Sequence, residues 1–381
     1  MTDTPRINRS QFLQRTAAVG LLALGAATTG TATAAAAPQS AGRRKLEFKG
    51  VAYDTGTGFV GDDSRVLWRK CIVRSELRAV RDRLHANWVS IYGSDVRRLV
   101  DTATEALELG LRVSIQPRSF DEPQADELEK LRKVAVQAER LRRRYRQEVI
   151  LVIGCEFMLF TPGIIPGANF FERVEYLQQG EFDMAELQRK FRAFTAQMVK
   201  VARSNFKGRI TYGAAHDLER VDWSLFDIVG LDYYSYHEDR AGHTEELAPF
   251  RRWNKPIMIL EFGCCTFTGA AERGGMGWDI VDYSGDVPVI PPQYVRDEQE
   301  QADHLANMLD VFTDEGFLGA SPYTFISPDA PHRPHDRPHD EDMAAFSLCK
   351  VIRKNDDDPA SPYRWEPKKS FRSVSRFYLT H

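Results

Sequence analysis

Eight short, strongly apolar runs alternate with longer amphipathic stretches along most of this chain. Each run has the length and the β-branched or aromatic content of a β-strand. The predicted strands are Phe48–Tyr53, Asn87–Tyr92, Arg112–Gln116, Glu148–Gly154, Arg209–Gly213, Phe226–Asp232, Pro256–Phe262 and Gly319–Phe325. Strands that alternate with helices in this way predict an α/β fold with a parallel sheet.

The stretches between the runs have helical periodicity and helical length. The clearest are Ser75–Leu84, Val96–Leu109, Ala125–Tyr145, Met184–Ser204 and Glu298–Phe312. Two of the strands, around 149–153 and 257–260, are continuously apolar, which is typical of strands covered by helices outside and facing a filled interior. The pattern therefore predicts a (β/α)8 barrel, and because no linker interrupts residues 48–381 we expect one domain there.

The first 37 residues have the organisation of an export signal. Arg6, Arg9 and Arg15 lie at or before an apolar run at 17–24, and the alanines at 34–36 supply small residues for cleavage. The segment 8–13 is similar to a twin-arginine export motif, although Asn8 stands in place of the first arginine. A membrane anchor is the alternative, but the run is well short of the roughly 20 residues that span a bilayer.

We therefore expect residues 1–37 to be a signal peptide and residues 38–47 a short linker. The protein would then be secreted or held in the cell envelope, by the twin-arginine or the general secretory route, with no stable membrane span after processing.

Charge is nearly balanced over the 381 residues, with 51 basic and 54 acidic side chains. The basic cluster at 142–144 lies within a helical pattern and fits a solvated helix face. A nucleic acid or an anionic membrane would call for a larger basic surface. Composition therefore favours a neutral partner.

Five cysteines are an odd number, so at least one thiol stays free or pairs between chains. None has a CxxC partner or a histidine at ligand spacing, so we expect no metal cluster, and small buried thiols best fit Cys155, Cys264 and Cys265. The repeated Pro-His-Asp units of 332–340 suggest metal binding as an alternative to a mobile polar loop over the cleft. Their prolines favour an extended loop without fixed ligand geometry, and we expect neither a metal nor a cofactor.

Two glutamates lie where a barrel enzyme carries its chemistry, at the carboxyl ends of strands. Glu156 follows the fourth predicted strand and Glu261 ends the seventh. These strands lie on nearly opposite sides of an eight-stranded ring, so the two carboxyls can face each other across its mouth. Retaining glycoside hydrolysis needs such a pair, about 5–5.5 Å apart, with one carboxyl as acid/base and the other as nucleophile.

The local sequences resemble those of the large clan of retaining glycosidases that carry glutamates after strands four and seven of the barrel, the cellulase and mannanase-like enzymes. The segment Lys255–Gly263 looks like the clan's nucleophile strand, with its KP…EFG pattern. The segment 226–234 is similar to its strand six, and 365–371 to the segment before its last helix. The resemblance implies that Glu156 is the acid/base, Glu261 the nucleophile, and Tyr234 the tyrosine that holds the nucleophile, with Tyr236 as second choice.

The chain departs from the clan at two positions. The acid/base is usually preceded by an asparagine that bonds the sugar 2-hydroxyl, and this chain has Cys155, a poor substitute. The last strand lacks the clan's tryptophan, and Tyr323 and Phe325 occupy that region.

Further residues near strand ends are candidates for substrate binding. They are Asp54, Tyr92, Arg118, His216 with Asp217, Tyr236, Trp278 and Tyr323. Phe157, Phe160 and Tyr283 add aromatic rings to the same loops, where packing is the alternative role. The long insert Thr266–Tyr294 is expected to shape a subsite.

Two functions follow from these residues. The first is a retaining glycoside hydrolase that acts on a β-linked oligosaccharide or polysaccharide by double displacement. The second is a barrel that has lost turnover and serves as an exported carbohydrate-binding or regulatory protein, an alternative that rests on Cys155.

Overall fold

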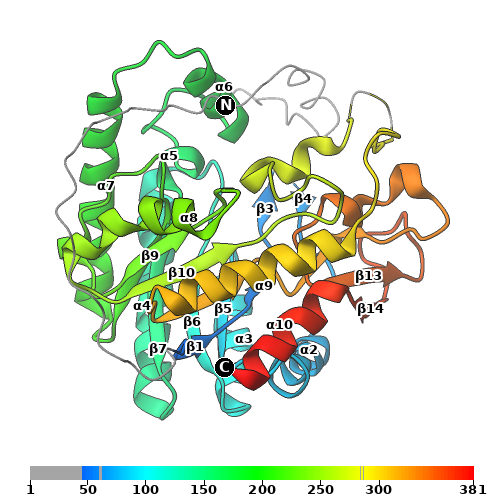
Figure 1. The fold of residues 1–381 in the computed structure, drawn as a ribbon. Helices are drawn as coiled ribbons and strands as arrows, with labels where there is room; N and C mark the ends of the chain where they lie inside the picture. Colours follow the sequence, from blue (N-terminus) through cyan, green and yellow to red (C-terminus); the bar gives the residue numbers. More distant parts are fainter. Residues whose placement is uncertain (1–44, 60–61, 284, 286) are drawn as a thin grey trace, which may run out of the picture.

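The strands form one curled parallel sheet, seen in a computed structural model that describes residues 45–59, 62–283, 285 and 287–381 (Figure 1). The order in the sheet is β1-β11-β10-β9-β8-β7-β6-β5-β2. The strands are β1 (Phe48–Lys49), β2 (Ala52–Asp54), β5 (Trp88–Gly93), β6 (Arg112–Pro117), β7 (Val149–Cys155), β8 (Ile210–Ala215), β9 (Val229–Asp232), β10 (Ile257–Phe262) and β11 (Gly319–Pro322). The predicted signal peptide and most of the predicted linker lie outside the described residues.

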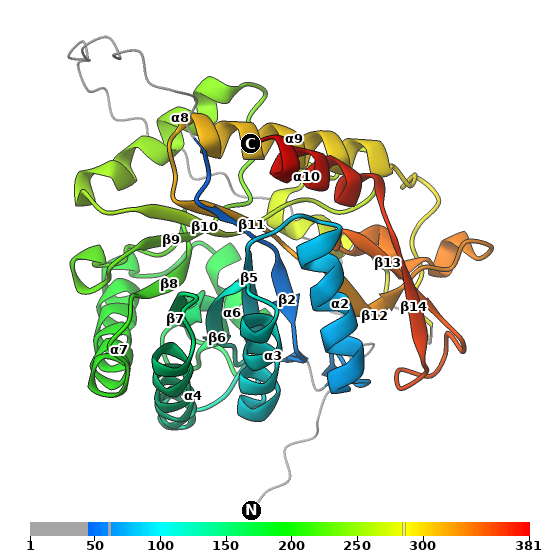
Figure 2. The ribbon, with the colours of Figure 1, turned by 90° about the horizontal axis from the view of Figure 1, so that it is seen from below.

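The sheet closes through a single strand that is interrupted at its centre. β1 pairs with β11 and β2 pairs with β5, so the two ends of the sheet order are consecutive parts of the segment 48–54. Gly50 N donates to Ala320 O at 3.0 Å on one side, and Ser90 N donates to Val51 O at 3.0 Å on the other. The predicted (β/α)8 barrel is confirmed, and Figure 2 shows the strands inside a ring of helices.

Apolar side chains fill the barrel interior below the carboxyl ends of the strands, a part called the lower interior. They form one buried cluster of Phe48, Trp88, Ile150, Val152, Ile228, Met258 and Leu260. The ring of Phe48 packs edge-on to that of Trp88, with centroids 5.8 Å apart. Chemistry is therefore restricted to the carboxyl ends of the strands, where the interior becomes polar.

The five predicted helices are present with small shifts at their ends. They are α2 (Lys70–Asp82), α3 (Val96–Glu108), α4 (Gln124–Arg144), α7 (Met184–Asn205) and α9 (Glu298–Asp314), and α10 (Lys369–Thr380) closes the chain. Aspartates begin three of them: Asp95, Asp183 and Asp297 each accept hydrogen bonds from backbone amides of the first turn. No helix of the described residues is long and apolar enough to cross a membrane.

One side of the barrel lacks its helix. Between β8 and β9 the described chain contains only a short 3-10 turn, η1 (Trp223–Leu225). The next connection carries α8 (Arg240–Leu247) and the 3-10 segment η2 (Ala248–Trp253). The outer faces of β8 and β9 are therefore covered only by a loop and by the neighbouring helices.

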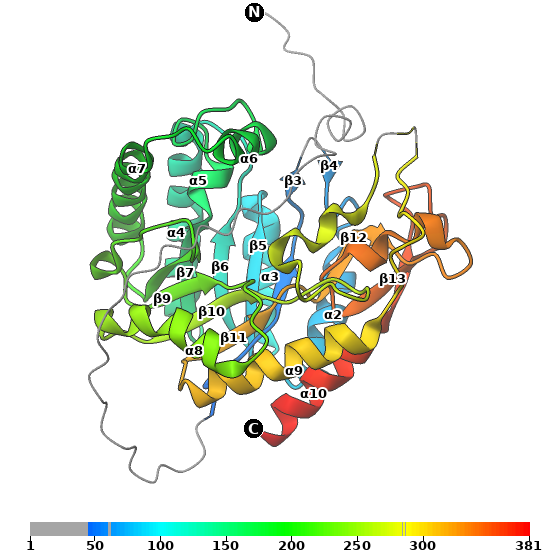
Figure 3. The same ribbon diagram turned by 45° about the horizontal axis from the view of Figure 1, so that its top comes forward.

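Additional elements lie at the carboxyl ends of the strands (Figure 3). They are the hairpin β3 (Gly58–Phe59) and β4 (Asp62–Asp63), the helices α5 (Phe157–Phe160) and α6 (Phe170–Gln178), and the 3-10 segment η3 (Gly274–Ile280). A second sheet, β12 (Ile326–Pro331), β13 (Cys349–Arg353) and β14 (Tyr363–Pro367), follows β11, with the turns η4 (Arg337–His339) and η5 (Glu341–Ala344) between its strands. This sheet was not predicted from the sequence, in which residues 332–340 were expected to form a polar loop and 365–371 to precede the last helix.

The buried carboxylate of Glu76 links the segment 48–54 to α2 and to the second sheet. Glu76 of α2, 1% exposed, accepts hydrogen bonds from Tyr53, from Tyr363 of β14 at 2.9 Å and from Arg65 at 2.9 Å. Arg65 is itself completely buried, and its guanidinium also lies over the Tyr53 ring, 4.8 Å from the centroid. The strand, the helix and the second sheet therefore meet at one ion pair.

Glu76→Gln is expected to lower the free energy of unfolding by about 3–5 kcal/mol, because Arg65 then keeps a buried charge with no carboxylate beside it. Chemical denaturation measures the change. The matched control is Glu129→Gln on α4, which breaks an exposed pair with Arg132 and should cost less than about 1 kcal/mol. Equal effects of the two substitutions would contradict the role assigned to Glu76.

Candidate active site

Glu156 lies at a sharp turn where β7 ends. Gly154 has a φ of +152°, and a Cβ at this position would lie 2.4 Å from the ring of Phe157, so only glycine fits. Glu156 follows with φ 45° and ψ 44°, the left-handed region that non-glycine residues rarely adopt. Its amide donates to Gly213 O of β8 at 2.9 Å. A left-handed residue of this kind is a form of backbone strain common at functional sites.

The segment after Glu156 is held by a second buried glutamate that the sequence analysis did not single out. Glu219, 4% exposed, accepts from Met158 N at 2.9 Å and from Tyr212 Oη at 2.8 Å. The same Tyr212 oxygen accepts from Phe157 N at 2.6 Å. These bonds satisfy the amides at the beginning of α5, so Glu219 acts on Glu156 through the backbone.

Glu261 ends β10 with its carboxylate held by two donors. Arg118, after β6, forms an ion pair with Oε1, and Tyr234, after β9, donates to Oε2 at 3.1 Å. Glu261 is 7% exposed and Arg118 is 5% exposed, so solvent screens this pair weakly. The contact expected between Tyr234 and Glu261 is present. Tyr236, the second choice, is 42% exposed.

Arg118 gathers several of the predicted binding residues around Glu261. Its Nε and Nη2 donate to Gln116 Oε1 at 3.0 and 2.6 Å, which fixes the plane of the guanidinium. The same group lies over the Tyr92 ring, 4.2 Å from the centroid, and Tyr92 stacks on Tyr323 at 5.5 Å. Residues at the ends of β5, β6 and β11 thus gather around the arginine that pairs with Glu261.

The two glutamates differ in their surroundings. Burial raises the pKa of the Glu156 carboxyl to about 8, and the negative charge of Glu261 acts in the same direction. The positive charge of Arg118 opposes the shift without cancelling it. Glu156 therefore holds a proton at neutral pH, whereas Glu261 lies against a cation and a phenol donor.

A third carboxyl lies beneath the pair. Asp232, the last residue of β9, is 2% exposed, and neither of its oxygens has a hydrogen-bond partner among the described residues. Burial raises the pKa of Asp232 well above its usual range, and the charges of Glu261 and Glu156 add to the shift. The sequence analysis placed Asp232 at a strand end but gave it no role, although that position was the available signal.

Cys155 lies beside this carboxyl. A Cβ added to Gly213 would be 2.9 Å from the Cys155 Cβ and 2.7 Å from Asp232 Oδ2, so the two side chains flank the same point of β8. Cys155 is 4% exposed, and burial raises the pKa of its thiol. The thiol is therefore neutral. All five cysteines are free, and four of them are buried, including the adjacent Cys264 and Cys265, as expected.

The side chains of two predicted binding residues are already hydrogen-bonded to other parts of the chain. Asp54 accepts from Gly56 N at 2.7 Å and from Ser64 Oγ at 2.5 Å, which shapes the β3–β4 hairpin. His216 contacts the Asp232 carbonyl at 3.1 Å through Nδ1, and its Nε2 lies 3.2 Å from Glu246. Both side chains therefore stabilise the loops around the site, and neither presents a free polar group.

The aromatic loop residues pack together on one side of the mouth. Trp278 of η3 lies against Phe171 of α6, with ring centroids 6.4 Å apart, and Phe160 lies 5.6 Å from Phe170. Tyr283 is buried in the cluster formed by the insert 266–294. This packing brings the insert that follows β10 against the helices that follow β7.

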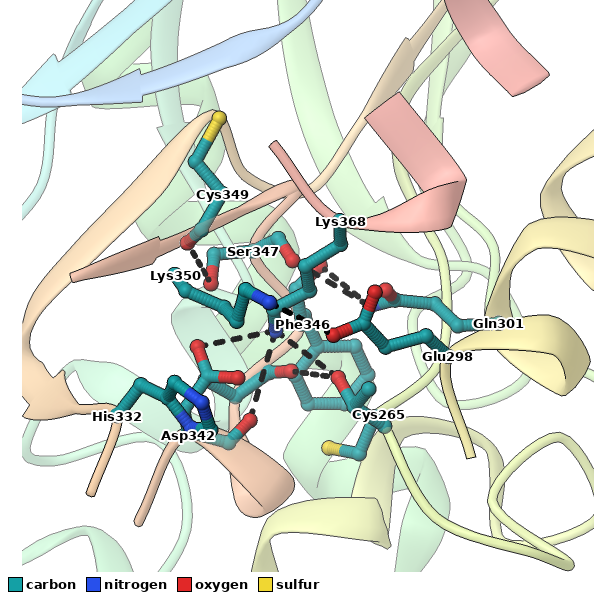
Figure 4. Close-up of polar contacts among 12 residues, drawn as sticks. Cys265, Glu298, Gln301, His332, Asp342, Phe346, Ser347, Cys349, Lys350 and Lys368 are labelled. Carbon is teal, nitrogen blue, oxygen red and sulfur yellow. Dashed lines mark hydrogen bonds and ion pairs between the residues drawn. The ribbon is translucent and has the colours of Figure 1, made fainter. Parts of the chain in front are cut away.

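The histidine-rich segment is packed, not loose as expected. His332 Nδ1 lies 2.9 Å from Asp340 Oδ1, and the oxygens of Asp340 and Asp342 lie close enough to His332 to resemble a metal site. The charges are already balanced, because Arg296 pairs with both aspartates and the buried Lys368 lies 3.1 Å from Asp342 Oδ1. Figure 4 shows Lys368 directed at Asp342. Both aspartates are therefore already paired with cations of the chain.

No family model and no curated protein matches this chain. Solved structures do match. A GH113 β-1,4-mannanase aligns over 88% of this chain and 100% of its own, with a TM-score of 0.57 and 14% identity. A GH2 β-galacturonidase from Eisenbergiella tayi aligns over 89% of this chain with a TM-score of 0.52 and 14% identity. β-Glucuronidase 3 from Bacteroides uniformis aligns over 88%, with a TM-score of 0.52 and 12% identity.

The chain has the fold of these glycoside hydrolases. It spans the whole mannanase but only 52% of the galacturonidase and 38% of the glucuronidase, so the similarity is to a part of those larger chains. At identities this low the likeness concerns the fold, and the case for an activity depends on the site.

Glu156 is expected to keep its proton up to a pH near 8, because burial and the charge of Glu261 both disfavour its carboxylate. Carbon-13 NMR of the glutamate carboxyls across a pH series measures this, with Glu156→Gln used to assign the signal. Glu261→Gln should lower the pKa of Glu156 because it removes a negative charge, whereas the exposed Glu186→Gln on α7 should leave it unchanged. An ordinary titration near pH 4.3 would refute the assignment.

Proposed function

We propose that this protein is a retaining glycoside hydrolase that cleaves a β-linked oligosaccharide or polysaccharide. The observation that carries the proposal is the contrast between its two glutamates. The two carboxylate oxygens of Glu261 contact Arg118 and Tyr234. Glu156 holds a proton, and the nearby charge of Glu261 helps to raise its pKa. A double displacement needs one ionised and one protonated carboxyl at the same mouth.

In the first step the Glu261 carboxylate attacks the anomeric carbon and forms a glycosyl-enzyme, while Glu156 passes its proton to the departing glycosidic oxygen. Tyr234 donates to the Glu261 oxygen at 3.1 Å and keeps the carboxylate oriented. In the second step Glu156, now ionised, takes a proton from water, and the resulting hydroxyl attacks the same carbon and releases Glu261. Retention predicts carboxyls about 5–5.5 Å apart.

The substrate class follows from aromatic residues near the site and from the structural neighbours. The partly exposed rings of Tyr323, after β11, and Trp278, in η3, suit the apolar faces of sugars. The neighbours suggest a first panel of β-1,4-mannan, aryl β-galacturonides and aryl β-glucuronides. Export through residues 1–37 is part of the proposal, and the N-terminal sequence of secreted protein tests it.

The second candidate function is a barrel that binds carbohydrate without turnover. Cys155 favours it, because a buried neutral thiol replaces the amide that would bond the sugar 2-hydroxyl. Sugar binding without hydrolysis over a broad substrate panel would support this candidate against the first.

Glu156→Ala is expected to reduce hydrolysis of natural glycosides by about 10²–10⁴-fold, since their leaving groups need a general acid. Activated aryl glycosides should lose much less, and added azide should restore part of their turnover. Glu261→Ala should lose both reactions because no glycosyl-enzyme forms. Steady-state rates on the paired substrates measure the contrast. Equal losses on both substrates in the Glu156 variant would remove Glu156 from the acid role.

Cys155→Asn is expected to raise kcat, because an amide at this position can bond the sugar 2-hydroxyl, an interaction that contributes several kcal/mol at the transition state. Asp232 lies beside position 155, and its unpartnered oxygens can accept hydrogen bonds from the new amide. Cys155→Ser is the control, since it is polar but short. If the asparagine variant folds and shows no gain over the serine variant, position 155 does not limit turnover.

A further inference from the structure

A pocket of about 420 Å³ lies on the outer wall of the barrel where the helix between β8 and β9 is missing. Its walls come from α7, from the loop that contains η1, and from η2. The volume is within the range of small-ligand sites. The pocket does not include Glu156 or Glu261, although it reaches Glu219 and His216, which support the loops around the active site.

Three arginines line this pocket and none forms an ion pair within the described residues. They are Arg192 of α7, Arg220 before η1 and Arg252 of η2, all exposed. Arg192 donates only a weak bond to the Arg220 carbonyl, at 3.4 Å. By contrast, the adjacent Arg251 is paired with Glu315. Guanidinium groups without a carboxylate partner offer planar, bidentate donors to a ligand.

The acidic residues of the pocket only partly offset the charge of these three arginines. Burial raises the pKa of Glu219 to about 8, so it is largely uncharged at neutral pH. Asp222 uses one oxygen to accept from Ser224 N at 3.1 Å and Ser224 Oγ at 2.6 Å, at the beginning of η1. The pocket therefore carries an excess of positive charge, although the chain as a whole has a net charge of -3.

Aromatic side chains form the rest of the wall. Trp223, 2% exposed, forms the floor, and the partly buried Phe250 and Trp253 lie beside it. The Arg252 guanidinium lies 5.3 Å from the Trp253 ring centroid. Aromatic faces bind the apolar faces of sugar rings, and arginines beside them select for a negative group on the ring.

We propose that this pocket, bounded by α7, η1 and η2, is a second carbohydrate-binding site that takes an acidic sugar unit such as a uronic acid residue. A nucleic acid fits less well, because it calls for an extended positive surface, whereas the 51 basic side chains of this chain are outnumbered by 54 acidic ones. The site holds an acidic glycan at the barrel wall and needs no turnover at the mouth, so the proposal stands apart from the hydrolase assignment.

Isothermal titration of the purified protein with tetragalacturonate tests the proposal, with neutral mannotetraose as the comparison. The titrations use the Glu261→Gln variant, in which no sugar is consumed. We expect tetragalacturonate to bind, and we expect this binding to become weaker as salt is added. Mannotetraose should bind at least tenfold more weakly.

In the same background, Arg220→Ala combined with Arg252→Ala should weaken the binding of tetragalacturonate at least tenfold. Arg220→Lys combined with Arg252→Lys should keep only part of the binding, because lysine lacks the planar, bidentate donors of arginine. The matched control is Arg97→Ala on α3, which removes the same charge from a side chain that is 90% exposed. Trp253→Ala measures how much the aromatic ring contributes to binding. Thermal melting checks that each variant is folded.

Three results would overturn the proposal. One is the absence of tetragalacturonate binding, and another is unchanged binding in the folded arginine variant. The third is tighter binding of a single-stranded oligonucleotide that the same arginine substitutions abolish, which would assign the pocket to nucleic acid. None of these results depends on whether Glu156 and Glu261 catalyse hydrolysis.

Discussion

Closure of the barrel through the segment 48–54 is the constraint on which the rest of the structure depends. This segment bonds to β11 through its first half and to β5 through its second half. Without it the parallel sheet has two open edges, and the strand ends do not surround a common mouth. The buried pair of Glu76 and Arg65, with Tyr53 from the same segment, joins this closure to α2 and to the second sheet.

Closure also explains why the catalytic candidates act as a group. Arg118, Tyr234 and Glu261 come from three different strands and meet only because the strand ends form a ring. The apolar lower interior excludes water from beneath them, so the charges of Glu156 and Glu261 interact strongly. A raised pKa at Glu156 is therefore a property of the closed barrel and not of its local sequence.

The same interior contains Cys155, a position at which this chain departs from the clan it resembles. Cys155 and Asp232 flank Gly213, one with a neutral thiol and the other with unpartnered oxygens. Outside, the missing helix between β8 and β9 exposes a pocket lined with arginines. This pocket arises where the chain omits a helix that a symmetrical barrel would have.

The sequence by itself determined the eight strands, the five principal helices and the positions of Glu156 and Glu261 at strand ends, because these follow from hydrophobic periodicity. The choice of Tyr234 came from the resemblance of the segment 226–234 to the clan's sixth strand. Only the tertiary structure decided that Glu219 supports the turn at Glu156, that Asp232 is buried without partners, and that the segment 332–340 is packed by Arg296 and Lys368. These properties depend on contacts between residues far apart in the chain. A sequence pattern reports which face of an element is apolar, but burial and the pairing of charges are set by whichever distant segment covers that face.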